Sequence, residues 1–290
     1  MHGERIKVWS IVAESYGFLL RHPRALIRVG WLPLLALWGL NLVFQSYRPW
    51  PESVAPAELL SHATLLPLHV LAQSVVAAVV LVAWHRVVLL GEDAAVGLLG
   101  IRLGRREFGY LGIWLLLCLA FFVILLLAWA LMIALGFGAL LGTRTAMVTA
   151  GSLGNVALED STQIIILVVL SVCGGLALAF YATTRVSLVL PAMATDKQRS
   201  LGGAWQMSEG NGWRLVAASL LVMLPMQVAY LITAQVTAGI DETLIQAAAA
   251  LLPSGFMLLL IVVTGTVLSL FSRQLEQASR DATDVAEAAA

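Results

Sequence analysis

Six stretches of this chain are each long and apolar enough to cross a lipid bilayer. A span needs roughly 20 mostly apolar residues, because the hydrocarbon core is about 30 Å thick and a helix rises about 1.5 Å per residue. Each stretch is much longer than a barrel strand and lacks strict alternation, so we expect helices. The stretches lie at about 28–48, 63–90, 111–142, 163–190, 214–237 and 249–272.

The composition supports the same class of protein. Of the 290 residues, 60% are hydrophobic and 12% are charged, whereas about 25% of residues are charged in a typical soluble domain. The mean hydropathy is +0.91. We therefore predict an all-α fold, a polytopic membrane bundle of six transmembrane helices. The zero net charge predicts no nucleic-acid partner, because there is no basic surplus to neutralise phosphates.

The distribution of Lys and Arg predicts the orientation in the membrane. An even number of spans places both termini on the same side. Of the 17 Lys and Arg residues, only Arg48 and Arg144 fall on the opposite side. Cytoplasmic loops are enriched in these residues, so we predict that both termini are cytoplasmic. The N-terminal 20 residues lack the uninterrupted apolar core of a signal peptide, and we expect them to be retained.

A short amphipathic segment precedes the first pair of spans. In residues 7–21, Val8, Val12, Tyr16 and Leu19 share one face of a helix. Such a helix is expected to lie on the cytoplasmic interface with its apolar face in the headgroup region.

Two later segments have similar spacing and indicate an internal repeat. Val96, Leu99 and Leu103 precede the third span, and Leu201 and Trp205 precede the fifth. The second and fourth spans also end alike, in "VAWHRVVLL" and "ATTRVSLVL". We predict three hairpin repeats, each preceded by a short interfacial helix. Residues 1–272 would form one integral membrane domain, with repeats at about 7–91, 92–191 and 197–272 and a cytoplasmic tail at 273–290.

Arginines near the cytoplasmic ends of the spans are the main candidates for a site. Arg86 and Arg185 occupy equivalent positions in two repeats. One interpretation is that they extend to the headgroups and fix the depth of their helices. Another is that they bind an anionic lipid headgroup or a phosphorylated substrate, and a third is pairing with an acid such as Glu92 or Glu209. Further arginines that could assist binding are Arg214, Arg102, Arg105 and Arg106.

Polar side chains inside the spans allow a second kind of site. Gln73, Gln227 and Tyr230 lie in predicted spans. Hydrogen bonds between helices would explain them, and a central polar cavity is the alternative.

Catalytic and metal chemistry have little support. The six stretches contain no Asp or Glu, which disfavours carriers that depend on intramembrane acids. The five histidines lack the spacing of a zinc protease, and we expect structural or interfacial roles for them. His62 and His69 are seven residues apart, too far for a compact metal site. We therefore expect no enzyme activity, no metal and no cofactor.

Residues 185–214, "RVSLVLPAMATDKQRSLGGAWQMSEGNGWR", resemble a segment of a bacterial protein family. The family comprises six-helix inner-membrane proteins, the YciC-like proteins and the membrane domain of some glycerophosphodiester phosphodiesterases. Its members have an arginine, a short apolar run and a proline, here Arg185 to Pro191, and later an aromatic and a basic residue, here Trp213 and Arg214. The resemblance implies a six-helix fold in the bacterial inner membrane and assigns no chemistry.

The leading interpretation is a non-enzymatic inner-membrane protein that binds anionic lipid and supports membrane organisation. Its site would be a lipid-facing cleft near the cytoplasmic leaflet, lined by Arg86 and Arg185. The alternative is a transporter or permease for a small or amphiphilic solute, with Gln73 and Gln227 in a central cavity. A water-filled cavity across the midplane would favour transport, and a dry core with a lateral basic groove would favour lipid binding.

Overall fold

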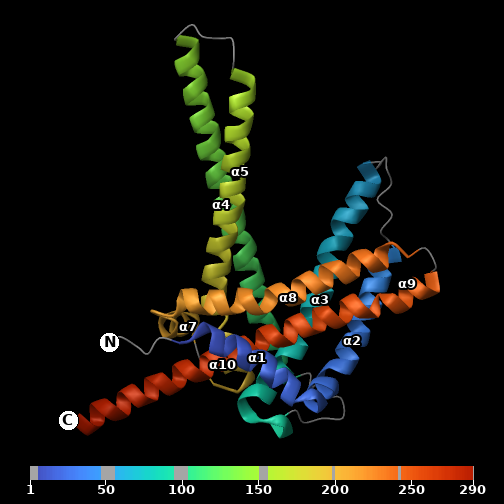
Figure 1. The fold of residues 1–290 in the computed structure, drawn as a ribbon, viewed down its shortest axis with the longest axis vertical. Helices are drawn as coiled ribbons and strands as arrows, with labels where there is room; N and C mark the ends of the chain where they lie inside the picture. The colour runs from blue at the N-terminus through green and yellow to red at the C-terminus, as the bar shows by residue number, and fades with distance from the viewer. Residues whose placement is uncertain are drawn as a thin grey trace. The chain divides into compact units, whose positions relative to one another are not determined.

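A computed structural model describes most of the chain, and the elements in it are helices (Figure 1). The described residues are 6–46, 56–94, 104–149, 156–197, 200–240 and 243–289, and they contain no strand. Within them, six helical segments are long and apolar enough to cross a membrane, as predicted. These candidate spans are Pro23–Phe44, Pro67–Leu90, Glu107–Leu131, Val169–Ala194, Gly212–Thr237 and Leu244–Val285.

The chain forms two compact units. The first comprises Met1–Leu115 and Arg185–Ala290, and the second comprises Leu116–Thr184. The predicted threefold repeat and the single membrane domain at 1–272 stay predictions.

The long helix α10 (Leu251–Ala289) is the centre of the first unit. It packs against α8 (Gly212–Ala238), α3 (Pro56–Leu90), α2 (Pro23–Ser46) and α1 (Val8–Arg21) (Figure 1). Its apolar side chains are buried along most of the span, which makes α10 the main element of the core.

A close backbone approach joins α10 to α3. A Cβ atom at Gly265 of α10 would lie 2.7 Å from Cδ2 of Leu81 in α3, closer than real Cβ contacts allow. Glycine at this position therefore lets the two helices pack at short range. α3 ends at Leu90 because Gly91 takes a φ of +98°, a left-handed conformation that glycine adopts without a steric penalty.

Helix α1 matches the predicted segment at 7–21 and packs against α8 and α10. Its buried residues are Ile11, Ser15 and Leu19, a face that only partly overlaps the predicted one. Tyr16 donates a hydrogen bond from its hydroxyl to the carbonyl of Val222, at 2.8 Å. These contacts hold α1 on the helix bundle, and its position at the membrane surface stays a prediction.

Short helices connect the longer ones in the first unit. They are η1 (Glu92–Ala94), α6 (Val189–Ala194), α7 (Leu201–Met207) and α9 (Thr243–Ala249). Helix α7 forms where the third interfacial segment is predicted, and the Ser200 hydroxyl caps it by accepting a hydrogen bond from the Gly203 amide at 3.0 Å. The segment with Val96, Leu99 and Leu103 lies outside the described residues.

The second unit is formed by α4 (Arg105–Thr149) from Leu116 onward and α5 (Val156–Val186) up to Thr184. The two helices run antiparallel and side by side (Figure 1). A Cβ atom at Gly175 would lie 3.1 Å from the Cβ of Ala128, so the helices pack closely there. Large apolar side chains on both helices are exposed, as hydrocarbon surroundings allow.

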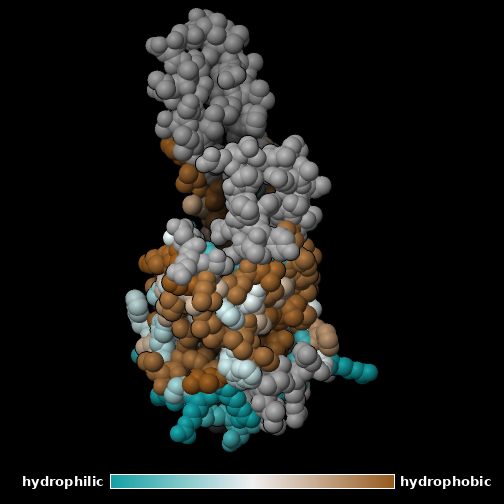
Figure 2. Space-filling model, turned by 90° about the vertical axis from the view of Figure 1, so that its right-hand side faces the viewer, coloured by the Kyte–Doolittle hydropathy of each residue, from teal (hydrophilic) through white to brown (hydrophobic). Residues whose placement is uncertain are grey.

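Apolar side chains dominate the described surface. Figure 2 shows hydrophobic residues over its middle part in that view and hydrophilic residues gathered at one end. Many large apolar residues are more than half exposed, among them Leu20 at 82% and Trp9 at 72%. Soluble monomers rarely expose apolar patches of more than a few hundred Å². With six spans of sufficient length, the chain is an integral, multi-pass membrane protein.

Candidate functional site

Arg185 lies at the end of α5 and is nearly buried, with 7% of its surface exposed. Its Nε atom donates to the Ser208 hydroxyl at 2.7 Å, and one terminal nitrogen donates to the Trp205 carbonyl at 2.7 Å. Its Cζ atom lies 3.8 Å from the centroid of a Trp205 ring, a cation–π contact. Arg185 therefore holds α7 and the turn that follows it against the end of α5.

Arg214 also bonds to the backbone. A terminal nitrogen of this residue of α8 donates to the Ile6 carbonyl at 2.7 Å. The Ile6 amide in turn donates to the Asn211 side-chain oxygen at 3.3 Å. The residues at the start of α8 thereby hold the segment before α1.

Arg86 has different surroundings. It is half-buried on α3, and a terminal nitrogen donates a long hydrogen bond of 3.4 Å to the Ala194 carbonyl, at the end of α6. Among the described residues, this carbonyl is its one polar partner, and no carboxylate pairs with it. Glu92, suggested as a partner for these arginines, lies 3.9 Å from His22 instead.

The first turns of α4 lie close to both α3 and α6. The Tyr110 hydroxyl is 3.0 Å from Nε2 of His85, the residue before Arg86. A Cβ atom at Gly109 would lie 3.7 Å from the Met193 side chain in α6. The start of α4, with the exposed Arg105, is therefore near Arg86 and the end of α6. Arg102 and the side chain of Arg106 lie outside the described residues.

The polar residues suggested for a central cavity have different surroundings. Gln73 donates to the Asn41 side-chain oxygen at 3.1 Å, and the Asn41 amide donates to the Ser254 hydroxyl at 2.9 Å. These two bonds link α3, α2 and α10. Gln227 is exposed on α8, and Tyr230 is half-buried on the same helix.

A buried hydrogen-bond network around His85 was not predicted. His85 is fully buried, and its Nδ1 atom lies 2.7 Å from the Ser269 hydroxyl while Nε2 contacts Tyr110. The neighbouring Trp84 donates from its indole to the hydroxyl of Thr266, about one turn before Ser269, at 2.7 Å. These bonds join α3, the start of α4 and α10, and they satisfy polar groups that would be costly if left unpaired.

A sequence signal for this network exists in the sixth span. Thr266, Ser269 and Ser272 recur every third residue in a mostly apolar stretch, so they share one side of the helix. All three are buried. A neighbouring helix can supply further partners for such a polar stripe, and the adjacent Trp84 and His85 are donors and acceptors of the right kind.

No metal-binding cluster of His, Cys, Asp or Glu occurs among the residues that were described. No family model matches the chain, and no curated protein or solved structure matches it. The resemblance to the six-helix inner-membrane group therefore stays a prediction.

Proposed function

We propose that this integral membrane protein binds an anionic lipid headgroup at Arg86 and supports membrane organisation without catalysing a reaction. The observation that carries the proposal is the half-buried Arg86 guanidinium, which has one long hydrogen bond and no paired carboxylate within the described chain. A partly desolvated cation without a counter-ion favours an anionic ligand. A phosphate group can accept two parallel hydrogen bonds from one guanidinium.

The surroundings of Arg86 also suit an anion. The start of α4 lies nearby, and its first turn holds Glu107, whose carboxylate is engaged in capping this turn and accepts a hydrogen bond from the Gly104 amide at 2.8 Å. Exposed Arg105 adds a second cation at this place. Arg102 and Arg106 are close in sequence and stay candidates for the same headgroup.

The arginines have different roles in this proposal. Arg185 and Arg214 already donate to protein oxygens, so we assign them to holding residues 185–214 in place. Arg86 is assigned to the lipid phosphate. This division replaces a cleft lined equally by Arg86 and Arg185 with a site centred on Arg86.

The proposal places the protein in a bacterial inner membrane with both termini in the cytoplasm, where Lys and Arg are concentrated. The resemblance to the YciC-like group agrees with this location. Transport has less support, because Gln73 is already hydrogen-bonded to Asn41 and Gln227 is exposed on α8.

The test is lipid binding by the full-length protein with Arg86→Gln. Native mass spectrometry of delipidated protein titrated with dioleoyl phosphatidylglycerol should show weaker binding of one lipid by this variant. Arg280→Gln, which removes an exposed charge near the end of α10, serves as the control and should bind like the wild type. Equal binding by Arg86→Gln and the wild type would contradict the proposal.

A further inference from the structure

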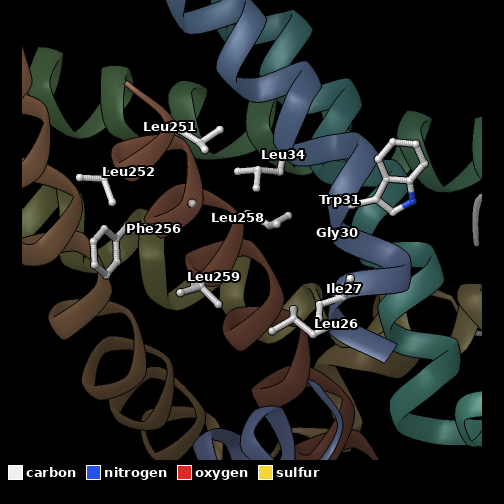
Figure 3. A pocket seen from close by; sticks show the side chains of 11 residues that line it. Leu26, Ile27, Gly30, Trp31, Leu34, Leu251, Leu252, Phe256, Leu258 and Leu259 are labelled. Carbon is white, nitrogen blue, oxygen red and sulfur yellow. The ribbon is translucent and has the colours of Figure 1, made fainter. Parts of the chain in front are cut away.

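An open apolar groove lies between α2 and α10 in the first unit (Figure 3). Its volume is about 460 Å³, within the range of about 300–1,000 Å³ that is usual for ligand pockets. In Figure 3, Leu34 and Leu258 lie between the two helices, and Trp31 lies on the α2 side. The lining is almost entirely hydrocarbon.

Two glycines explain why space remains between these helices. A Cβ atom at Gly30 of α2 would lie 2.9 Å from Cδ2 of Leu258, so α2 and α10 touch at this point. A Cβ atom at Gly255 would have no neighbouring heavy atom within 4 Å. The helices are therefore in contact at Gly30 and leave empty space beside Gly255.

The position of the groove favours a hydrocarbon occupant. Both walls belong to candidate membrane spans, so we expect lipid chains beside an open groove between them. Water has no polar partners there and would not be retained. An acyl chain would supply the dispersion contacts that the lining side chains otherwise lack.

Basic residues occur at one end of the groove only. Four exposed residues lie at spacings of three and four and therefore share one face of α2. They are Arg24, Ile27, Arg28 and Trp31. Ile27 and Trp31 line the groove, while Arg24 precedes both and Arg28 lies between them in the N-terminal part of α2. The α10 wall near Leu251 contains no charged residue between residues 244 and 258. One basic end and an apolar remainder match the charge distribution of an anionic phospholipid.

We propose that the groove binds one acyl chain of an anionic glycerophospholipid, whose phosphate contacts Arg24 and Arg28. Trp31, one turn after Arg28 on the same face of α2, is exposed and has an indole ring that suits both apolar and polar surroundings. The site is distinct from the headgroup site at Arg86 and does not depend on it.

The first test fills the groove. Gly255→Leu places a side chain in the empty space, and Gly39→Leu is a matched control, because a Cβ at Gly39 of α2 also has no neighbour within 4 Å and lies outside the groove. Native mass spectrometry of full-length, delipidated protein measures binding of dioleoyl phosphatidylglycerol. Gly255→Leu should lower the affinity of one site by about tenfold or more, and Gly39→Leu should leave it unchanged. Unchanged binding by Gly255→Leu, or an equal loss in both variants, would overturn the proposal.

The second test removes the charge of two exposed side chains. In protein that also carries Arg86→Gln, which removes the other proposed anion site, the double variant Arg24→Gln/Arg28→Gln should bind dioleoyl phosphatidylglycerol and dioleoyl phosphatidylcholine with equal affinity, whereas Arg86→Gln alone should still prefer the anionic lipid. These side chains are exposed, so this result decides the proposal even where Gly255→Leu folds poorly. A preference retained by the double variant, or oleate binding as tightly as the phospholipid, would overturn it. Arg86→Gln should leave lipid binding in the groove intact. A failure of the groove proposal can therefore be told apart from a failure of the proposed function at Arg86.

Discussion

At the scale of single residues, the surroundings of a cation decide what it does. Arg185 and Arg86 end two apolar helices in similar sequences, yet Arg185 has several protein acceptors and a stacked indole while Arg86 has one distant carbonyl. A guanidinium that is already hydrogen-bonded contributes to stability. One that is half-buried and poorly paired is available to a ligand. The two residues should therefore respond differently to substitution.

Arg185→Ala should destabilise the folded protein by about 2–4 kcal/mol, because it removes two charge-assisted hydrogen bonds and the cation–π contact with Trp205. Thermal unfolding in detergent measures the change. Arg185→Lys should recover only part of the loss, since an ammonium cannot stack on Trp205 as a planar guanidinium does. Arg105→Ala is the control, because that side chain is exposed and should cost little. A similar loss in both alanine variants would contradict the structural role of Arg185.

Ser269→Ala tests the network at His85. The substitution leaves Nδ1 of a fully buried imidazole without its partner, which should cost about 1–3 kcal/mol of unfolding free energy. Chemical unfolding in detergent measures this cost. Thr283→Ala removes a comparable hydroxyl that bonds to the Ser279 carbonyl on an exposed part of α10, and it should be nearly neutral. If the two variants are equally stable, the network contributes nothing.

At the scale of elements, glycines set the distances between helices. Gly265 brings α10 against α3, and Gly30 brings α2 against α10. Because the core is close-packed, side chains in contact with such a glycine have little room to move. Gly255 has the opposite surroundings, with open space beside it on the same helix. Two glycines of α10 thus mark a close helix contact and a groove.

Gly265→Ala should destabilise the protein by about 1–3 kcal/mol, because the new methyl group meets Leu81 in a packed core. Gly255→Ala should be neutral or stabilising by up to about 1 kcal/mol, since alanine favours the helix and meets no neighbour. Unfolding temperatures of both variants in the same detergent give the comparison. The reverse order of stability would show that α3 and α10 are not in close contact at Gly265.

At the scale of the whole molecule, the charge distribution and the apolar surface define the membrane topology. Six candidate spans and the concentration of Lys and Arg in one set of segments predict cytoplasmic termini. A fluorescent protein fused to the C-terminus should therefore be fluorescent, and alkaline phosphatase at the same place should be inactive. Fusions at residues 144–150, in the expected outer loop, should give the opposite pair of results. An active phosphatase at the C-terminus would reverse the proposed orientation.

Several features of the fold were predictable because they depend on neighbouring residues along the chain. They are the helical class, the six apolar spans, and the helices at 7–21 and near Leu201. Hydropathy and helical periodicity are local properties, so the sequence alone determines the presence and approximate position of these helices. The sixth span, however, was placed at 249–272 and runs over Leu244–Val285. The first span illustrates the remaining error, since it begins at Pro23 and was placed at residue 28. The arginines were also recognisable as a set, because charges inside or beside apolar runs stand out.

The partners of these residues were decided by the tertiary structure. His85 meets Ser269, 184 positions away, and Arg214 meets Ile6, 208 positions away. Which arginine is paired, and where α2 and α10 leave a groove, depends on how distant helices pack. A single sequence records composition and local order, which is why it determined a helical membrane protein. Hydrogen-bond geometry and empty space arise only when helices from opposite ends of the chain are brought together.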